Sequence, residues 1–219
     1  MTLELQKRII TSIILLLLLL LMFSYSFILI ISSIIIGLIS WIEFYALISK
    51  IVKKNDNKSR ILRFLFKSFS LLYLSGLVFW IIIAKLVTLD LYIILIYSLL
   101  VAIMSDIGGL VVGKTFKGKK LSKISPNKTL SGSLGSFIFS FILIPFFLKY
   151  FDNYNFLTII LFTIIISLAS QLGDLFISAL KRKAKVKDTS DLLPGHGGVL
   201  DRIDGIIFAI PMGLLVFNI

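Results

Sequence analysis

The chain has 219 residues, of which 58% are hydrophobic, and its formal net charge at pH 7 is +12. Its mean hydropathy is +1.04, which means more apolar surface than a soluble domain of this size could bury. The same composition excludes a disordered chain, and the absence of Cys excludes a disulfide-stapled secreted domain. We therefore expect an all-α, polytopic integral membrane protein whose few charges cluster where function should be sought.

The apolar runs predict about seven membrane-spanning helices. Residues 9–48 contain one acidic or basic side chain, Glu43, and are too long for one span, so we expect two helices joined by a turn near residues 24–26. The first run is not a signal peptide, because no small-residue cleavage site follows it and a second apolar run does. The runs are unbroken rather than alternating, which favours helices over a barrel. Five further spans are expected at residues 68–86, 89–107, 132–150, 155–177 and 203–219.

The basic residues predict the orientation of these spans. Apart from Lys85 and Lys149, every Lys and Arg lies before the first span or in the loops over residues 50–67, 114–128 and 181–202. With seven spans these segments share one face, which the positive-inside rule assigns to the cytoplasm. The C-terminus should then lie at the outer face.

The segment over residues 105–132 is rich in glycine and lysine. Glycine lets backbone N–H groups approach an anion, and lysine supplies positive charge. The order Gly113-Lys114-Thr115 suggests a P-loop, but the full spacing and a preceding strand are missing, so we reject that interpretation. Taken alone, the segment is explained by a solvated basic loop on the cytoplasmic face.

The segment over residues 174–204 contains acidic residues beside the membrane that a merely basic loop does not need. Asp201 and Asp204 are three residues apart and would share one face of a helix, as would Asp174, Ser178 and Lys181 upstream. Three carboxylates meeting at a membrane edge would repel one another unless a cation held them. Mg²⁺ typically uses one or two carboxylates plus substrate phosphates, which nearby Lys and Arg would also bind.

His196 is the only histidine of the chain and lies between glycines. A zinc site is not expected with one His and no Cys. A phosphate contact and a polar loop residue without a role both remain open for it.

The segment over residues 178–204 resembles the signature of the phosphatidate cytidylyltransferase (CDP-diacylglycerol synthase) family, with matching spacing throughout. The matching positions are Ser178, Lys181, Arg182, Lys187, Asp188, Leu193, Pro194, His196, Gly197, Gly198, Asp201, Arg202 and Asp204. Further likeness lies in Gly173-Asp174-Leu175, in Ser105-Asp106 with Gly108 and Gly113-Lys114, in Ser125-Pro126 with Lys128-Thr129, and in Trp41, Glu43 and Phe44. Ser131 departs from the family, which usually has Glu or Gln there, and the chain is shorter than typical members.

The resemblance implies an enzyme that converts phosphatidate and CTP into CDP-diacylglycerol and pyrophosphate with Mg²⁺, and it leaves open a second, monovalent cation such as K⁺. It implies metal ligands at Asp174, Asp201 and Asp204. Asp106 would either bind the metal as well or contact one of its ligands. The residues that it implies in phosphate binding and catalysis are Lys181, Arg182, Lys187, Asp188, His196 and Arg202, with Asp188 positioning a lysine or binding a second cation. The implied substrate pocket contains Lys114, Ser125, Lys128, Thr129, Ser178, Gly197 and Gly198.

The resemblance also implies one membrane domain over residues 1–219, in which N-terminal helices over 1–67 are weakly separable from a catalytic half over 89–219. We expect it in the inner membrane of a bacterium with its site facing the cytoplasm. The alternatives are a CTP-dependent polyprenol or phytol-type lipid kinase and a non-enzymatic polytopic protein. Nucleic acid is not expected as a partner, because membrane orientation explains the lysines. A homodimer is left open.

Overall fold

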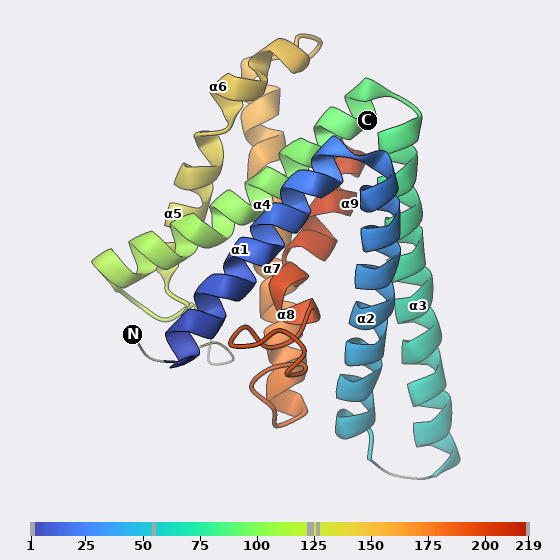
Figure 1. Cartoon of the computed structure of the whole chain (residues 1–219). Coiled ribbons are helices and arrows are strands. Elements are labelled where there is room, and N and C mark those ends of the chain that lie inside the picture. The colour runs from blue at the N-terminus through green and yellow to red at the C-terminus, as the bar shows by residue number, and fades with distance from the viewer. Residues whose placement is uncertain (1–2, 54–55, 122–124, 126–127, 218–219) are drawn as a thin grey trace. The chain divides into compact units, whose positions relative to one another are not determined.

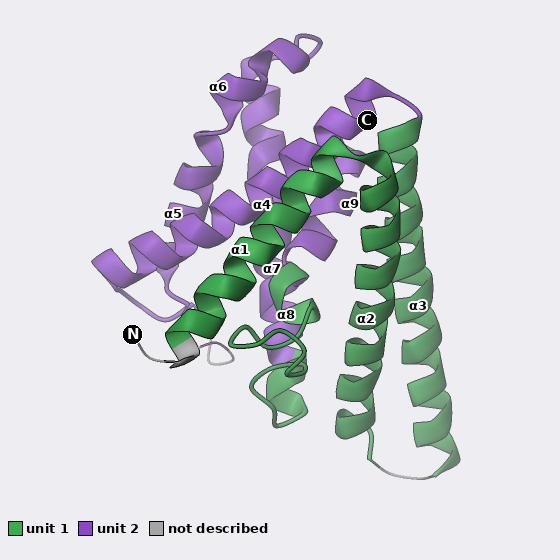
Figure 2. Cartoon of the chain, viewed as in Figure 1, with its two compact units in different colours: residues 1–86, 180–203 green, residues 87–179, 204–219 purple. Residues whose placement is uncertain are grey.

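A computed structural model describes residues 3–53, 56–121, 125 and 128–217 of the chain. The regular secondary structure in this part of the chain is helical, apart from two isolated β-bridges (Figure 1). Six helical segments in it are long and apolar enough to cross a membrane, which confirms the predicted all-α membrane bundle. The chain forms two compact units, residues 1–86 with 180–203 and residues 87–179 with 204–219 (Figure 2).

The first unit contains helices α1 (Leu3–Ser24), α2 (Ser26–Ile51), α3 (Asn57–Leu86) and the short α8 (Leu200–Ile203). Helices α1 and α2 separate at Tyr25, within the predicted turn. Helix α3 begins at Asn57, well before the apolar run predicted at 68–86. Lys and Arg are good helix formers, so the basic residues that end an apolar run do not end the helix.

The second unit contains α4 (Leu89–Phe116), α5 (Leu130–Phe141), α6 (Ile144–Phe147), a 3₁₀ turn η1 (Leu148–Tyr150), most of α7 (Phe156–Lys183), and α9 (Ile206–Val216). Thr88 separates α4 from α3, and its side chain accepts a hydrogen bond from the N–H of Leu91 at 3.3 Å. The predicted span at 132–150 is interrupted after Phe141, and Pro145 opens the next helical turn. Proline has no N–H to continue the ladder, but it suits the first turn of a helix.

Helices α4 and α5 pack closely because glycines face one another at their contact. A Cβ on Gly135 would lie 2.7 Å from the carbonyl oxygen of Gly108, and a Cβ on Gly132 would lie 2.7 Å from that of Gly109. These distances leave no room for a side chain, so the two backbones touch, as small residues allow in membrane helices. Gly109 and Gly132 also line a cavity described below, so part of its wall is backbone.

An aromatic cluster joins other elements of the second unit. Tyr97 of α4 is fully buried, and its hydroxyl lies 2.5 Å from Thr163 Oγ1 of α7. Its ring packs edge-on against Phe147, Phe151 and Phe217. This cluster holds the end of α9 against α4 and the turn after α6.

Candidate active site

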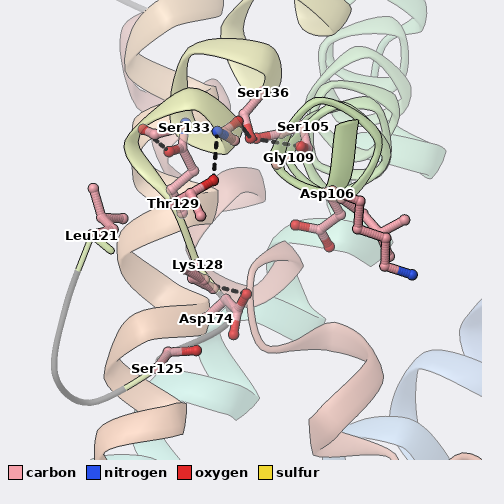
Figure 3. Close-up of a pocket in the computed structure, with 15 residues that line it drawn as sticks. Ser105, Asp106, Gly109, Leu121, Ser125, Lys128, Thr129, Ser133, Ser136 and Asp174 are labelled. Carbon is pink, nitrogen blue, oxygen red and sulfur yellow. Dashed lines mark hydrogen bonds and ion pairs between the residues drawn. The ribbon is translucent and has the colours of Figure 1, made fainter. Parts of the chain in front are cut away.

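A cavity of about 480 Å³ opens in the second unit between α4, α5 and α7 (Figure 3). Its walls combine glycine backbone with short polar and charged side chains. The residues that line it are Ser105, Asp106, Gly109, Leu110, Gly113, Lys114, Leu121, Ser125, Lys128, Thr129, Gly132, Ser133, Ser136, Gln171 and Asp174. Six sequence-predicted site residues therefore come together here: Asp106, Lys114, Ser125, Lys128, Thr129 and Asp174. Pro126, which belongs to the same motif, lies outside the described residues.

The charged groups of the cavity are two carboxylates and a paired lysine. Lys128 forms an ion pair with Asp174 Oδ2, while Ser178 Oγ donates to Asp174 Oδ1 at 3.2 Å. Asp106 contributes the second carboxylate from α4 (Figure 3). In this arrangement Lys128 offsets one negative charge, and the cavity leaves room for phosphate groups.

The carboxylate pair fits the chemistry of Mg²⁺, which takes oxygen ligands and often combines one or two carboxylates with phosphates of a substrate. Among the described residues, no group of three or more His, Cys, Asp or Glu side chains is placed to hold a metal ion. A cation held by Asp106 and Asp174 would therefore need further oxygen ligands.

A chain of hydrogen bonds among polar side chains, which sequence reasoning missed, forms one wall of the cavity. Ser133 Oγ donates to Gln171 Oε1 at 2.5 Å, and Gln171 Nε2 donates to Ser167 Oγ at 3.3 Å. Ser167 Oγ in turn lies 2.9 Å from Ser105 Oγ. The bonds join α5, α7 and α4 beside the two carboxylates. Gln171 lies two residues before the Gly173-Asp174-Leu175 motif.

Thr129 and Ser131 organise the entrance to α5. Thr129 Oγ1 caps the helix by accepting from the N–H of Gly132 at 3.0 Å. Ser131, the residue that departs from the family pattern, lies 3.0 Å from the same hydroxyl and donates to the carbonyl of Lys117. Its side chain therefore fastens the basic loop to the start of α5.

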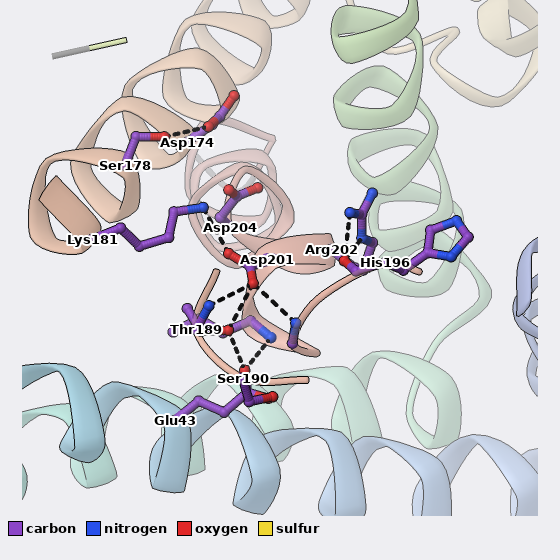
Figure 4. Close-up of polar contacts among 12 residues, drawn as sticks. Glu43, Asp174, Ser178, Lys181, Thr189, Ser190, His196, Asp201, Arg202 and Asp204 are labelled. Carbon is purple, nitrogen blue, oxygen red and sulfur yellow. Dashed lines mark hydrogen bonds and ion pairs between the residues drawn. The ribbon is translucent and has the colours of Figure 1, made fainter. Parts of the chain in front are cut away.

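The second cluster lies in the first unit, around residues 184–199, which we call the signature loop (Figure 4). Asp201 follows this loop and accepts four hydrogen bonds. Lys181 Nζ donates to its Oδ1 at 2.6 Å. The N–H and hydroxyl of Thr189 donate to its Oδ2 at 2.7 Å and 2.9 Å, and the N–H of Gly198 does so at 2.9 Å.

These contacts determine the charge of Asp201. Burial of the carboxyl group opposes its ionisation, but the hydrogen bond from Lys181 and those from the backbone of Thr189 and Gly198 outweigh burial and hold its pKa below the usual range. Asp201 is therefore an anion at neutral pH, paired with a lysine rather than exposed.

Glu43 reaches the same loop from α2. Its Oε2 accepts from Thr189 Oγ1 and from the N–H of Leu200, each at 2.8 Å. Its Oε1 accepts from Ser190 Oγ at 2.6 Å and from the N–H of Val199 at 3.1 Å. The sequence motif contained Glu43 but gave no indication of these partners.

Helix α1 contacts the centre of the signature loop. Thr11 Oγ1 donates to the carbonyl of Pro194 at 3.0 Å, and Ser12 Oγ lies 3.2 Å from His196 Nε2. Arg202 donates to the carbonyl of His196 from Nε at 3.0 Å and from Nη2 at 2.6 Å. Gly197 adopts a φ of +81°, a left-handed backbone that favours glycine. His196 and Arg202 thus stabilise a tight turn in addition to any contact with a phosphate.

The remaining predicted residues are placed differently. Arg182, Lys187 and Asp188 are exposed on or after the end of α7. Asp201 lies in α8, which ends at Ile203, and Asp204 is the next residue. Asp204 lies in the turn before α9, where its Oδ1 accepts from the N–H of Gly205 at 2.9 Å. Gly205 follows, and a Cβ there would lie 3.1 Å from the carbonyl oxygen of Ser170, so glycine lets this backbone pack closely against α7.

The fold and these two clusters define a polytopic membrane protein with acidic and basic groups suited to phosphate and cation binding. The profile of the cytidylyltransferase family matches residues 2–219, and the chain belongs to this family. It is 42% identical over 120 residues to a phosphatidate cytidylyltransferase of Staphylococcus haemolyticus (strain JCSC1435). It is 41% identical over 121 residues to one of Staphylococcus aureus (strain COL). Each match covers 54% of this chain and 46% of the relative, about half its length.

Proposed function

We propose that this protein is a Mg²⁺-dependent phosphatidate cytidylyltransferase that transfers CMP from CTP to phosphatidate and releases pyrophosphate. The observation that carries the proposal is the cavity in which Asp106, Lys128 and Asp174 meet. In a member of the cytidylyltransferase family, such a cavity supplies both a cation-binding pair and a phosphate-binding lysine. The names of the relatives support phosphatidate as the acceptor.

The reaction needs charge neutralisation more than a strong base. The second pKa of a phosphate monoester is about 6, so the phosphate of phosphatidate is largely a dianion near pH 7. One of its oxygens forms a bond to the α-phosphorus of CTP, while the bond from that phosphorus to the bridging oxygen breaks and pyrophosphate leaves. Bringing two polyanions together is the main barrier, as in phosphoryl transfer generally. We therefore favour direct in-line transfer without a covalent enzyme intermediate.

The proposed roles follow the two clusters. Asp106 and Asp174 would hold Mg²⁺, which when bound lowers the charge on the triphosphate. Lys128 keeps the Asp174 carboxylate oriented and offers a positive charge to a phosphate entering the cavity. Asp201 and Asp204 remain candidates for the metal from the sequence, and Lys181, Arg182, Lys187 and Arg202 for the phosphates. A second monovalent cation and a homodimer stay open under the same proposal.

We further propose that the basic ends of the helices face the cytoplasm of a bacterial cell. The basic loops connect α2 to α3, α4 to α5 and α7 to α8. Six apolar segments of spanning length support the membrane location, and the positive-inside rule supports the direction. CTP would then reach the protein from the side on which nucleotides are made.

The test uses purified protein in phospholipid nanodiscs with phosphatidate, Mg²⁺ and CTP labelled at either the α- or the γ-phosphorus. We expect the α-label to enter the lipid and the γ-label to leave in pyrophosphate. Transfer of the γ-label to a lipid would instead identify a CTP-dependent lipid kinase. For variants of Asp106, Asp90→Asn is the matched control. Asp90 is an exposed acid in the first turn of α4, the helix that carries Asp106 near its other end.

A further inference from the structure

We propose that Glu43 is a positioning residue, which acts from α2 by holding the signature loop so that Asp201 and Lys181 are presented in a fixed geometry. This inference rests on the proposed function for its effect on catalysis, but the holding itself is a separate, measurable property. Glu43 is not assigned to any substrate or metal.

The first support is the saturation of the Glu43 carboxylate. It is 5% exposed and accepts four hydrogen bonds, two on each oxygen. Two donors are hydroxyls in the loop, Thr189 and Ser190, and two are the backbone N–H groups of Val199 and Leu200. One buried carboxylate therefore joins residues 189–190 within the loop and residues 199–200 at its end to helix α2. Hydrogen bonds to a charged acceptor are among the stronger ones.

The second support is the space around Gly198. A Cβ at this position would lie 2.6 Å and 2.7 Å from the two carboxylate oxygens of Glu43. The backbone of Gly198 therefore packs directly against the Glu43 carboxylate, and no larger residue fits at position 198. Gly198 also donates its N–H to Asp201 Oδ2 at 2.9 Å, so the same residue touches both acids.

The third support is the link to the candidate catalytic groups. Thr189 Oγ1 lies 2.8 Å from Glu43 Oε2 and 2.9 Å from Asp201 Oδ2 (Figure 4). Asp201 in turn binds Lys181 Nζ at 2.6 Å. A displacement of Thr189 away from Glu43 would therefore move a donor of Asp201 and loosen the lysine pair.

The decisive variant is Glu43→Gln. The amide keeps the size of the side chain, but one oxygen becomes an NH₂ group, which faces a hydroxyl and a backbone N–H that need an acceptor. Hydrogen–deuterium exchange of nanodisc-embedded protein should quicken at least about tenfold in peptides covering residues 188–202, equivalent to about 1.4 kcal/mol. The exchange in α4 and α5 should stay unchanged.

The catalytic readout separates positioning from folding. In Glu43→Gln, kcat should fall at least about tenfold per folded molecule, while the KM values for CTP and phosphatidate stay within about threefold. A purely structural residue would lower the folded fraction and leave both constants of the remaining enzyme unchanged. The control is Ser40→Ala on the same helix, a fully buried residue whose hydroxyl donates to the carbonyl of Ile36 at 2.7 Å. It should alter neither readout.

Thr189→Val is the second variant. It removes the shared hydroxyl at nearly constant shape, and combined with Glu43→Gln it should cost less than the sum of the two single effects. If Glu43→Gln unfolds the protein, the loop exchange and kcat of Thr189→Val decide the proposal alone.

Unchanged loop exchange in the folded variant, or faster exchange with unchanged kcat, would overturn the proposal. If the wild-type protein makes no CDP-diacylglycerol, the proposed function fails, while the exchange data still show whether Glu43 holds the loop.

Discussion

Lys181 Nζ lies 2.6 Å from Asp201 Oδ1, and this ion pair joins the end of α7 to the start of α8 across the signature loop. The two side chains are 12% and 4% exposed, so the pair is shielded from water. Removing one partner of a shielded pair leaves an uncompensated charge and costs more than the pair itself contributes. Lys181→Met should therefore loosen the loop more than Arg182→Met, which removes an exposed neighbour, in the same exchange measurement.

Substitution of the cavity acids should alter the response to Mg²⁺. For Asp106→Asn and Asp174→Asn we expect kcat/KM to fall at least about a hundredfold, equal to about 2.7 kcal/mol. The Mg²⁺ concentration for half-maximal rate should rise, because a ligand has been lost. Asp90→Asn should change neither value. A Mg²⁺ dependence that stays at the wild-type value in both cavity variants would rule out the pair as ligands.

The same titration decides the role of Asp201 and Asp204. Both Asn variants should lose at least about nine-tenths of the activity while still inserting into the membrane, since tenfold corresponds to about 1.4 kcal/mol. A metal ligand would also show a raised Mg²⁺ requirement. Asp201, whose two oxygens accept four hydrogen bonds, would show activity loss with an unchanged requirement if it only positions Lys181.

The glycine contact between α4 and α5 should tolerate no added methyl group. For Gly135→Ala we expect destabilisation of about 1–3 kcal/mol, because the new Cβ would overlap Val112 and approach Gly108. Gly76→Ala in α3 is the control, since no atom lies within 4 Å of its Cβ position, and alanine there should be neutral or stabilising by about 0.5–1 kcal/mol. Thermal unfolding in one detergent measures both; equal effects would contradict the packing argument.

The orientation can be tested directly because the chain has no Cys. Lys58→Cys and Lys183→Cys, at exposed positions near the basic loops, should react with membrane-impermeant maleimides only from the cytoplasmic side. Asp152→Cys, in the turn before α7, should react only from outside. Labelling of Lys183→Cys in intact cells would sink both the orientation and a cytoplasmic site.

The kinetic pattern tests direct transfer. Initial rates should give intersecting lines when CTP and phosphatidate are varied, because both substrates bind before reaction. His196→Ala should slow the reaction without changing that pattern. A covalent nucleotidyl-enzyme would give parallel lines and would exchange labelled pyrophosphate into CTP without lipid. Such exchange in the wild type, lost in His196→Ala, would make His196 the nucleophile.

Ser131 offers a separate test of the family departure. Its hydroxyl donates to the carbonyl of Lys117, a bond that an ionised glutamate cannot make because it only accepts, but a glutamate at this position could orient a lysine of the basic loop instead. Ser131→Glu should therefore change turnover by less than about tenfold. A rise of a hundredfold or more would show that serine limits this protein.

The sequence predicted the helices well where apolar runs were separated by turn residues or helix caps. The breaks at Tyr25 and before Leu89 lie where expected. It did not predict that α3 starts at Asn57. Hydropathy marks the part of a helix that lies in lipid, whereas the basic residues at 58–67 continue the helix into water. The interruption beside Pro145 could have been anticipated from its missing N–H.

The site was predicted in its residues rather than in its contacts. Motif spacing pointed to Asp174 and Lys128, which form an ion pair in the cavity. Motif spacing could not predict the partners of Glu43, because Thr189 is 146 residues away and only tertiary folding brings the two together. Local periodicity did not predict that α8 ends at Ile203, one residue before Asp204.

The hydroxyl of Thr189 carries one proton but lies within hydrogen-bond distance of two carboxylates. It can satisfy only one of them fully at a time, so Glu43 and Asp201 compete for it. A cation that occupied Asp201 Oδ2 would end the competition and leave the proton to Glu43. Ligand binding at Asp201 would thereby strengthen the hydrogen bond from Thr189 to Glu43 through a rotation of one O–H bond.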